Sequence, residues 1–91
     1  MTPLQLRFRA VVAALQEGEV VSYGEVARRA GNHKQARAVG AFLAEHGGDV
    51  PWWRVVHRDG TLAAPNAREQ RRRLLAEGVD VTRGRVVGGV P

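Results

Sequence analysis

The sequence predicts a mainly α-helical domain with a small β-hairpin, and three observations lead to this prediction. Residues 2–18 and 22–31 each open with a capping-box pattern and close on a glycine, as helices commonly do. A third apolar stretch with helical spacing runs to about residue 46, and beyond residue 51 the apolar residues alternate as in a strand. The chain has 91 residues, which leaves room for one small core, so we expect residues 1–91 to form a single domain.

The first helix is predicted from its opening and from its apolar stripe. Thr2 can cap a helix whose first residue is Pro3, and Gln5 completes the capping box. The apolar residues that share one face of this helix are Leu4, Phe8, Val11, Val12 and Leu15. Gly18 is expected to end it.

The next two helices are predicted to form a helix-turn-helix. Ser22 and Glu25 make a second capping box, which opens a helix through Ala30, and Gly31 closes it. Asn32 is then expected to cap a third helix that runs to about residue 46, and its inward-facing residues are expected to be Val39, Phe42 and Leu43. Two helices joined by so tight a turn are typical of a helix-turn-helix, although helical pairs with no nucleic-acid role share this outline.

After Pro51 the spacing favours a β-hairpin. Residues 53, 55 and 57 alternate with residues 54, 56 and 58, and Asp59-Gly60 is a pair that two-residue hairpin turns prefer. Residues 61–63 would then form the return strand. A helix-turn-helix followed by such a hairpin is a winged helix-turn-helix, with the hairpin as the wing.

The last third of the chain is expected to contain one helix and one strand. The helix begins at Asn66, buries Leu74 and Leu75, and ends at Gly78. The tail that follows is rich in valine and glycine and is expected to hold one strand around residues 85–87. We assign no function to this tail.

Arginine dominates the charge of the chain. Thirteen of the fourteen basic residues are arginine, against nine acidic residues, and the net charge is +5 with a pI near 11.3. This balance favours a polyanionic partner, nucleic acid first of all, because the guanidinium group both holds phosphate and stacks on bases. A soluble basic protein without such a partner is the alternative.

Several kinds of site are excluded or disfavoured by residues that the chain lacks. It has no cysteine, so it forms no disulfide, no thiolate metal site and no cysteine nucleophile. His33, His46 and His57 do not have metal-ligand spacing, and no phosphate-binding loop occurs, so we expect neither a metal nor a cofactor. Since the chain shows no apolar run near the ~18 residues of a membrane span and no signal-peptide pattern, we expect a cytoplasmic protein that does not bind membranes.

Five residues are candidates for contact with nucleic acid. One face of the predicted third helix carries Lys34, Arg37, Ala38 and Ala41, where small side chains let the backbone approach a groove and Arg37 extends as a single long probe. Tyr23 lies in the first turn of the second helix, where unpaired N–H groups favour a phosphate. The alternatives stay open: the alanines pack on another helix, Arg37 is solvated, and Tyr23 is an aromatic residue at the edge of the core.

Two further groups have more than one interpretation. Trp52 and Trp53 are adjacent, so in a strand their rings point to opposite faces and only one readily joins the core. The other can stack on a base or pack beneath the wing. The predicted fourth helix carries a basic cluster, which we interpret as a solvated face in preference to a phosphate contact: Arg68, Arg71, Arg72 and Arg73.

Five motifs occur in an order and spacing that resemble those of a known family. They are Tyr23-Gly24-Glu25-Val26-Ala27, Arg37-Ala38-Val39-Gly40, Pro51-Trp52-Trp53-Arg54-Val55-Val56, Asp59-Gly60 and Leu74 to Gly78. Over about residues 4–78 the chain resembles the DNA-binding domain of O6-alkylguanine-DNA alkyltransferases. It resembles more closely the alkyltransferase-like proteins, in which the acceptor cysteine of a Pro-Cys-His-Arg-Val motif is replaced, often by tryptophan. Each motif alone is weak, whereas the ordered set is specific.

The resemblance implies a winged helix that binds duplex DNA through the minor groove and rotates an O6-alkylguanine out of the stack. Tyr23 would press on the phosphate, and Arg37 would take the place that the base leaves. The lesion pocket would be formed by Tyr23, Trp52, Trp53 and Arg54.

The same resemblance implies that the chain has no catalytic residue for alkyl transfer. Trp52 stands at the position of the acceptor cysteine, Trp53 at that of the motif histidine, and Glu77 at that of the acid in the proton relay. We therefore expect a non-enzymatic sensor of DNA damage, a monomer that passes the lesion to nucleotide excision repair proteins; the hand-over is implied by the resemblance alone. The alternative from another class is a winged-helix transcription regulator that reads a specific DNA sequence.

Overall fold

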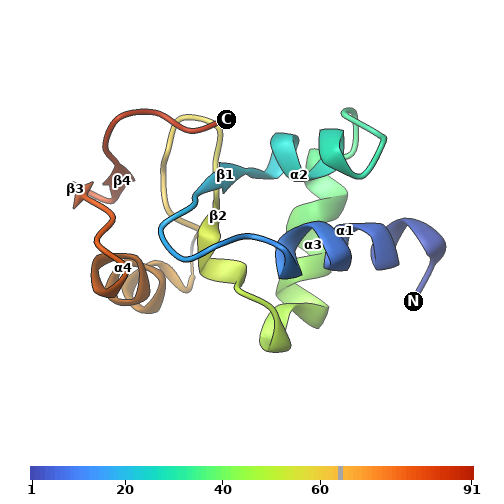
Figure 1. The fold of residues 1–91 in the computed structure, drawn as a ribbon, viewed down its shortest axis with the longest axis horizontal. Coiled ribbons are helices and arrows are strands. Elements are labelled where there is room, and N and C mark those ends of the chain that lie inside the picture. Colours follow the sequence, from blue (N-terminus) through green and yellow to red (C-terminus); the bar gives the residue numbers. More distant parts are fainter. Residues whose placement is uncertain (64) are drawn as a thin grey trace.

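The structure describes residues 1–63 and 65–91 (Figure 1). This part of the chain contains four α-helices, two short 3₁₀-helices and four two-residue strands. In this computed structural model the elements in chain order are α1 (Pro3–Ala13), β1 (Val21–Ser22), α2 (Tyr23–Arg29), α3 (Ala36–His46), η1 (Gly47–Asp49), η2 (Trp52–Arg54), β2 (Val55–Val56), α4 (Ala67–Ala76), β3 (Val81–Thr82) and β4 (Arg85–Val86). The predicted class, mainly helical with a small β-hairpin, is confirmed. No helix among the described residues is both long enough and apolar enough to cross a bilayer.

The first helix begins as predicted and ends early. The Thr2 hydroxyl accepts a hydrogen bond from the Gln5 N–H (3.1 Å), and the Gln5 side chain accepts one from the Thr2 N–H (3.0 Å), so both halves of the capping box form. The helix ends at Ala13 instead of near Gly18. Leu15 is still buried, because a tighter turn in which its N–H donates to the Val12 carbonyl (3.1 Å) carries it back to the core.

The turn between α2 and α3 is longer than predicted, and the expectation that Asn32 caps α3 is wrong. Gly31 adopts the left-handed conformation (φ +93°), and the Asn32 N–H then donates to the Ala27 carbonyl (2.9 Å), so Asn32 closes α2. The next residues are drawn into the turn, where the Gln35 N–H donates to the Asn32 carbonyl (3.1 Å). As a result α3 begins at Ala36 instead of His33.

The sequence predicted that residues 52–56 form the first arm of a hairpin, and this prediction is wrong. Trp52–Arg54 is a 3₁₀-helix closed by a hydrogen bond from the Arg54 N–H to the Pro51 carbonyl (3.1 Å). The strand is reduced to Val55–Val56, and it pairs in parallel with β1, so that Val55 lies opposite Val21 and Val56 opposite Ser22. The expected alternation of the two tryptophans across a strand is lost with that strand.

A turn does form here, but its central residues are Arg58 and Asp59 instead of the predicted Asp59-Gly60, and the residues after it pair mainly with the β3–β4 hairpin. The Gly60 N–H donates to the His57 carbonyl (2.8 Å), and Thr61 then bridges to Arg85 of β4. The backbone of β4 packs directly on Gly60, since a Cβ at that position would come within 2.9 Å of the Val86 carbonyl oxygen. The small hairpin of this fold is therefore β3–β4, and the strand expected around residues 85–87 is confirmed as one of its arms. We refer to residues 57–63 as the wing.

Two hydrophobic cores lie on either side of the β1–β2 pair. The first is enclosed by α1, α2 and α3, and the second lies beneath α4 and the β3–β4 hairpin, on the other side of the pair in Figure 1. Neighbouring residues of β2 divide between the cores: Val55 belongs to the first and Val56 to the second, and both are fully buried. Successive strand residues point to opposite sides, so a strand of two residues is enough to join the two cores.

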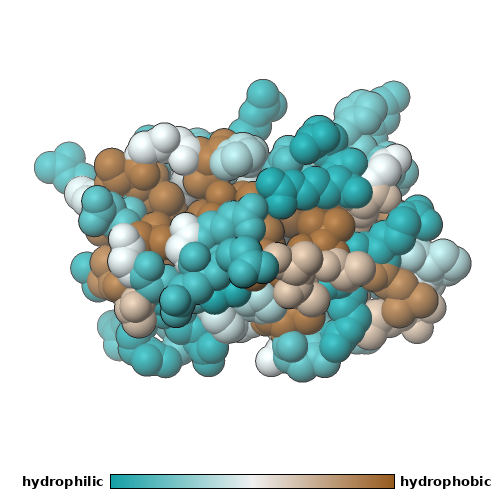
Figure 2. All heavy atoms as spheres, viewed as in Figure 1, coloured by the Kyte–Doolittle hydropathy of each residue, from teal (hydrophilic) through white to brown (hydrophobic). Residues whose placement is uncertain are grey.

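The expectation that Leu75 is buried is wrong. Leu74 is completely buried, whereas Leu75 is 41% exposed, because each residue of a helix is rotated by about 100° from the one before it. The other large hydrophobic side chains that are exposed are Met1, Leu6 and Val87. Figure 2 shows one face of the molecule, where hydrophobic atoms appear between hydrophilic side chains that occupy much of the outline.

One turn before Leu74, the same face of α4 buries a polar residue, Gln70, with no exposed surface. Its Nε2 donates to the carbonyls of Val55 (2.8 Å) and Trp53 (3.2 Å), and its Oε1 accepts from the Ala63 N–H (2.7 Å). Both ends of the amide are therefore satisfied, and α4 is fixed to η2, β2 and the wing.

We expect Gln70→Met to lower the free energy of unfolding by roughly 2–4 kcal/mol, because methionine keeps the volume but leaves buried backbone groups without partners. Urea denaturation of both proteins measures the difference. Arg71→Met, at the exposed neighbouring position, is the matched control and should shift stability by less than about 0.5 kcal/mol. A Gln70→Met protein as stable as the parent would contradict this account of the wing.

Candidate nucleic-acid interface

Tyr23 and Trp52 line the same pocket, which has a volume of about 310 Å³. Small residues of α3 and η1 form much of its lining beside these two aromatic side chains. The lining residues are Tyr23, Gly40, Leu43, Ala44, Gly47, Gly48, Trp52, Ala63, Pro65 and Asn66. Gly47 lets the chain pass close to both side chains, because a Cβ there would lie 3.3 Å from Leu43 Cδ2 and 3.5 Å from Trp52 Cβ, and Leu43 would have to shift by a few tenths of an ångström.

A larger hollow of about 810 Å³, which we call the groove, shares Tyr23, Gly40 and Ala63 with the pocket. Residues of α3, of the wing and of the start of α2 surround it. Those that carry charge or an imidazole are Glu25, His33, Arg37, His57 and Arg58. Tyr23 therefore stands at the boundary between the groove and the pocket.

The Tyr23 side chain is placed by the start of α2 and by a glycine on α3. The Ser22 hydroxyl accepts from the Glu25 N–H (3.0 Å) and fixes the first turn, of which Tyr23 is the first residue. The ring passes close to Gly40, where a Cβ would lie 3.9 Å from Tyr23 Cε1. Burial raises the pKa of the Tyr23 phenol above its ordinary value, so the hydroxyl stays protonated and can donate a hydrogen bond to an anion.

The residues predicted to contact nucleic acid are only partly brought together. Arg37 is exposed and lines the groove beside Tyr23. Lys34 is exposed in the turn before α3, and Ala41 is exposed on α3, but neither lines the groove or the pocket. Ala38 is half-buried against the first core, which is the packing alternative weighed from the sequence.

Trp53 and Arg54, the other two residues predicted for the pocket, lie outside its lining. The Trp53 ring meets the Trp52 ring edge-on, with centroids 6.1 Å apart at 87°, and its Nε1 donates to Glu77 Oε2 (2.7 Å). The guanidinium groups of Arg73 and Arg54 lie 4.6 and 5.4 Å from the Trp53 ring centroid. Trp53 thus supports Trp52 from the side of α4.

Glu77 connects this support to the rest of the fold. Arg54 donates to its carboxylate at 2.7 Å and to the Leu15 carbonyl at 2.8 Å, and the Gly18 N–H donates to Glu77 Oε1 (2.8 Å). Burial alone would raise the pKa of Glu77, but the hydrogen bonds from Arg54, Gly18 and Trp53 outweigh it and lower the pKa to about 2. The carboxylate is therefore ionised at neutral pH and joins α4, η2 and the loop after α1.

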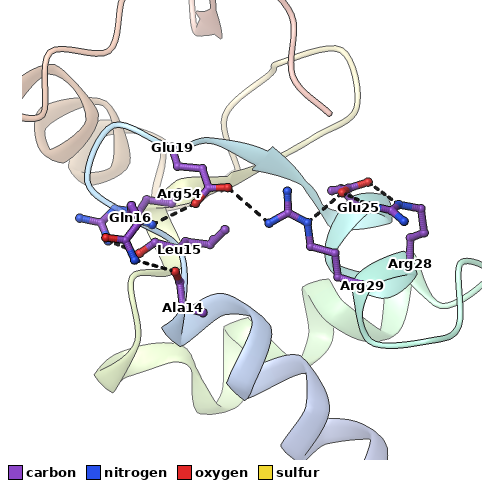
Figure 3. A network of polar contacts seen from close by, with 8 residues as sticks. All are labelled: Ala14, Leu15, Gln16, Glu19, Glu25, Arg28, Arg29 and Arg54. Carbon is purple, nitrogen blue, oxygen red and sulfur yellow. Dashed lines mark hydrogen bonds and ion pairs between the residues drawn. The ribbon is translucent and has the colours of Figure 1, made fainter.

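Two arginines of α2 are occupied by ion pairs. Arg28 and Arg29 hold the Glu25 carboxylate at 2.6 and 2.8 Å, and Arg29 also reaches Glu19 at 3.3 Å, as Figure 3 shows. Hydrogen bonds from these two arginines lower the pKa of Glu25 to about 2. The one acidic side chain of the groove lining is thus neutralised, while Arg37 and Arg58 make no ion pair within residues 1–63 and 65–91.

Sequence reasoning missed His57, which lines the groove and contacts Tyr23. The two ring centroids lie 5.2 Å apart with an interplanar angle of 55°. The contact follows from the register of the parallel pair, because Tyr23 and His57 directly follow the paired residues Ser22 and Val56. No local pattern in the sequence indicates a parallel pairing of two-residue strands.

The fold and these features define a class of protein: a helix-turn-helix DNA-binding domain with an aromatic pocket beside a basic groove. The family described as "6-O-methylguanine DNA methyltransferase, DNA binding domain" matches residues 3–79. The chain belongs to this family.

Two curated relatives are similar to this chain. The chain is 49% identical over 76 residues to a DNA base-flipping protein of Escherichia coli K12, which covers 79% of this chain and 59% of that protein. It is 38% identical over 76 residues to Alkyltransferase-like protein 1 of Schizosaccharomyces pombe, covering 77% of this chain and 70% of that one. The chain thus spans about three fifths of the length of its E. coli relative.

Solved structures share the fold. The crystal structure of S. pombe Atl1 in complex with damaged DNA containing O6-carboxymethylguanine superposes with a TM-score of 0.85 and 28% identity, over 100% of this chain and 91% of that chain. The O6-methylguanine methyltransferase of Mycobacterium tuberculosis superposes with a TM-score of 0.75 and 31% identity, over 85% of this chain and 49% of that chain.

The pKa of Glu77 predicts how stability depends on pH. A carboxylate with a folded-state pKa of about 2 and an ordinary value of 4.5 contributes stability above pH 4.5, and this contribution is lost as the pH falls toward 2. Over that window we expect the free energy of unfolding to fall by about 3 kcal/mol more in the parent than in Glu77→Gln.

Denaturant unfolding at several pH values between 2 and 6 measures this difference. Glu25 also titrates in this range, but it is present in both proteins and cancels in the comparison. Parallel pH profiles for the two proteins would show that Glu77 does not stabilise the fold through its charge.

Proposed function

We propose that this domain binds duplex DNA through the minor groove, receives an O6-alkylguanine rotated out of the base stack, and performs no chemistry on it. The observation that carries the proposal is the pocket walled by Tyr23 and Trp52, which adjoins the groove that Arg37 lines. Its volume of about 310 Å³ lies at the lower end of cavities that hold small ligands, a size suited to a single nucleobase.

The composition of the pocket supports binding without reaction. Alkyl transfer to protein requires a nucleophile such as a thiolate, and the chain has no cysteine. In this proposal Trp52 occupies the acceptor position and offers the flat face of an indole, which can stack on a base or on an alkyl group. Trp53 and Arg54 do not line the pocket and would act through Trp52. The Trp53 ring contacts Trp52, and Glu77 accepts hydrogen bonds from both Trp53 and Arg54.

Arg37 and Tyr23 are assigned the extrusion of the base. Removing a base from the stack costs a few kcal/mol, which new contacts must offset. The exposed Arg37 side chain has no acidic partner among the described residues, so it is free to enter the stack, while Tyr23 presses on the phosphate from the boundary of the pocket. Lys34, Ala38 and Ala41 are proposed to follow the DNA along the same side of the domain.

The names of the relatives support this assignment. One is described as a DNA base-flipping protein, and the other is seen in complex with DNA that contains O6-carboxymethylguanine. A binder that performs no chemistry needs a further protein to act on the lesion, so we include in the proposal that a monomer of this domain presents the complex to nucleotide excision repair.

The first test compares affinities for matched duplexes with guanine or O6-methylguanine at one position. We expect the lesion to bind at least tenfold more tightly, since an alkylated base is less firmly paired and costs less to extrude. Fluorescence anisotropy at fixed salt measures both affinities. Equal affinity for the two duplexes, or a preference governed by the surrounding sequence, would favour a transcription regulator instead.

The second test removes the two extruding side chains. Arg37→Ala should weaken lesion binding by about tenfold or more, because the gap in the stack goes unfilled. Arg83→Ala removes the same charge at the β3–β4 turn, away from both hollows, and is the control.

Tyr23→Ala should weaken binding more than Tyr23→Phe if the ring acts by steric pressure, and the same anisotropy assay ranks the two variants. If Arg37→Ala binds the lesion as tightly as Arg83→Ala does, the role given to Arg37 is wrong.

A further inference from the structure

The wing supplies the aromatic neighbour of Tyr23. His57 is the first wing residue, and its ring lies 5.2 Å from the Tyr23 ring at an angle of 55°, within the range in which aromatic pairs attract each other. Two backbone hydrogen bonds hold His57 in the turn: its N–H donates to the Thr61 carbonyl (3.0 Å), and its carbonyl accepts from the Gly60 N–H (2.8 Å). The imidazole is therefore carried on a closed turn.

Tyr23 packs only partly against the first core, and the rest of its ring borders open space. The pocket and the groove adjoin it, and α3 approaches it at Gly40, where a Cβ would lie 3.9 Å from Tyr23 Cε1. Tyr23 shares both hollows with Gly40 and Ala63, which offer little surface to a phenol ring. His57 is the aromatic contact that restricts the ring among the described residues.

We propose that His57 is a positioning residue for Tyr23, which holds the phenol ring at the boundary between groove and pocket in the orientation that extrudes a base. The inference rests on the proposed function. It separates two contributions: Arg37 and Arg58 supply positive charge to the groove and Arg37 also fills the gap in the stack, whereas the His57–Tyr23 contact orients the ring that presses the base out. His57 acts through its ring and not through its charge.

The test compares His57→Ala, His57→Phe and His33→Ala. His57→Ala removes the ring, His57→Phe keeps an aromatic ring without its nitrogen atoms, and His33→Ala removes an exposed imidazole from the same groove. Two readouts are used: affinities for guanine and O6-methylguanine duplexes, and the fluorescence of 2-aminopurine placed next to the lesion, which rises when the neighbouring base leaves the stack.

We expect His57→Ala to reduce the preference for the lesion duplex by roughly two- to tenfold and to lower the fluorescence rise. His57→Phe should restore both, and His33→Ala should reduce the preference by less than His57→Ala does. The inference is overturned if His57→Ala keeps the full preference, or if His57→Phe behaves like His57→Ala.

A measurement on the protein without DNA keeps this inference separate from the proposed function. NOE contacts between the Tyr23 ring and the Gly40 backbone should weaken in the NMR spectrum of His57→Ala and return toward the parent intensity in His57→Phe. A parent protein without lesion preference would overturn the proposed function, and unchanged contacts between Tyr23 and Gly40 would overturn the positioning role. Far-UV circular dichroism of each variant shows whether the fold is kept.

Discussion

The short parallel pair of β1 and β2 is the constraint on which the rest of the structure depends. Two residues on each strand join two hydrophobic cores, with Val55 in one and Val56 in the other. A pair this short is not stable alone, so burial on both sides must hold it. Its register then determines the site, because Tyr23 and His57 leave the pair side by side. Packing far from the surface thus sets the geometry of the surface that is proposed to meet DNA.

Glu77 shows how a carboxylate can serve a binding protein without moving a proton. The resemblance places it at the position of a relay acid, yet here its donors are an indole, a guanidinium and a backbone N–H, none of which gives up a proton near neutral pH. Its pKa of about 2 keeps it charged, and that charge anchors Trp53 and Arg54 behind Trp52. Trp52 is supported from the side of α4 as a consequence, which suits the proposed role of holding a base and leaving it unaltered.

Local signals in the sequence predicted local structure, and non-local pairing is where they failed. Thr2 and Gly31 act within one turn of their own helices, so the capping rules located the start of α1 and the end of α2. Gln70 is buried in an arginine-rich helix only because three backbone groups from other segments meet there, a fact that no periodicity expresses. The same limit applies to the site: Arg37 and Tyr23 were predicted from their own helices, whereas His57 depends on a register between distant strands.

Discrimination in the proposed function is a difference between two free energies, and the DNA supplies much of it. A guanine and its O6-alkyl derivative present nearly the same face to the indole of Trp52, so stacking alone cannot separate them. They differ in the cost of leaving the duplex, which is lower for a damaged pair, and in the apolar surface that the alkyl group adds. Leu43 and Ala44 line the pocket and can bury that surface. A preformed pocket with an aromatic wall therefore needs no specific hydrogen bond to the lesion in order to select it.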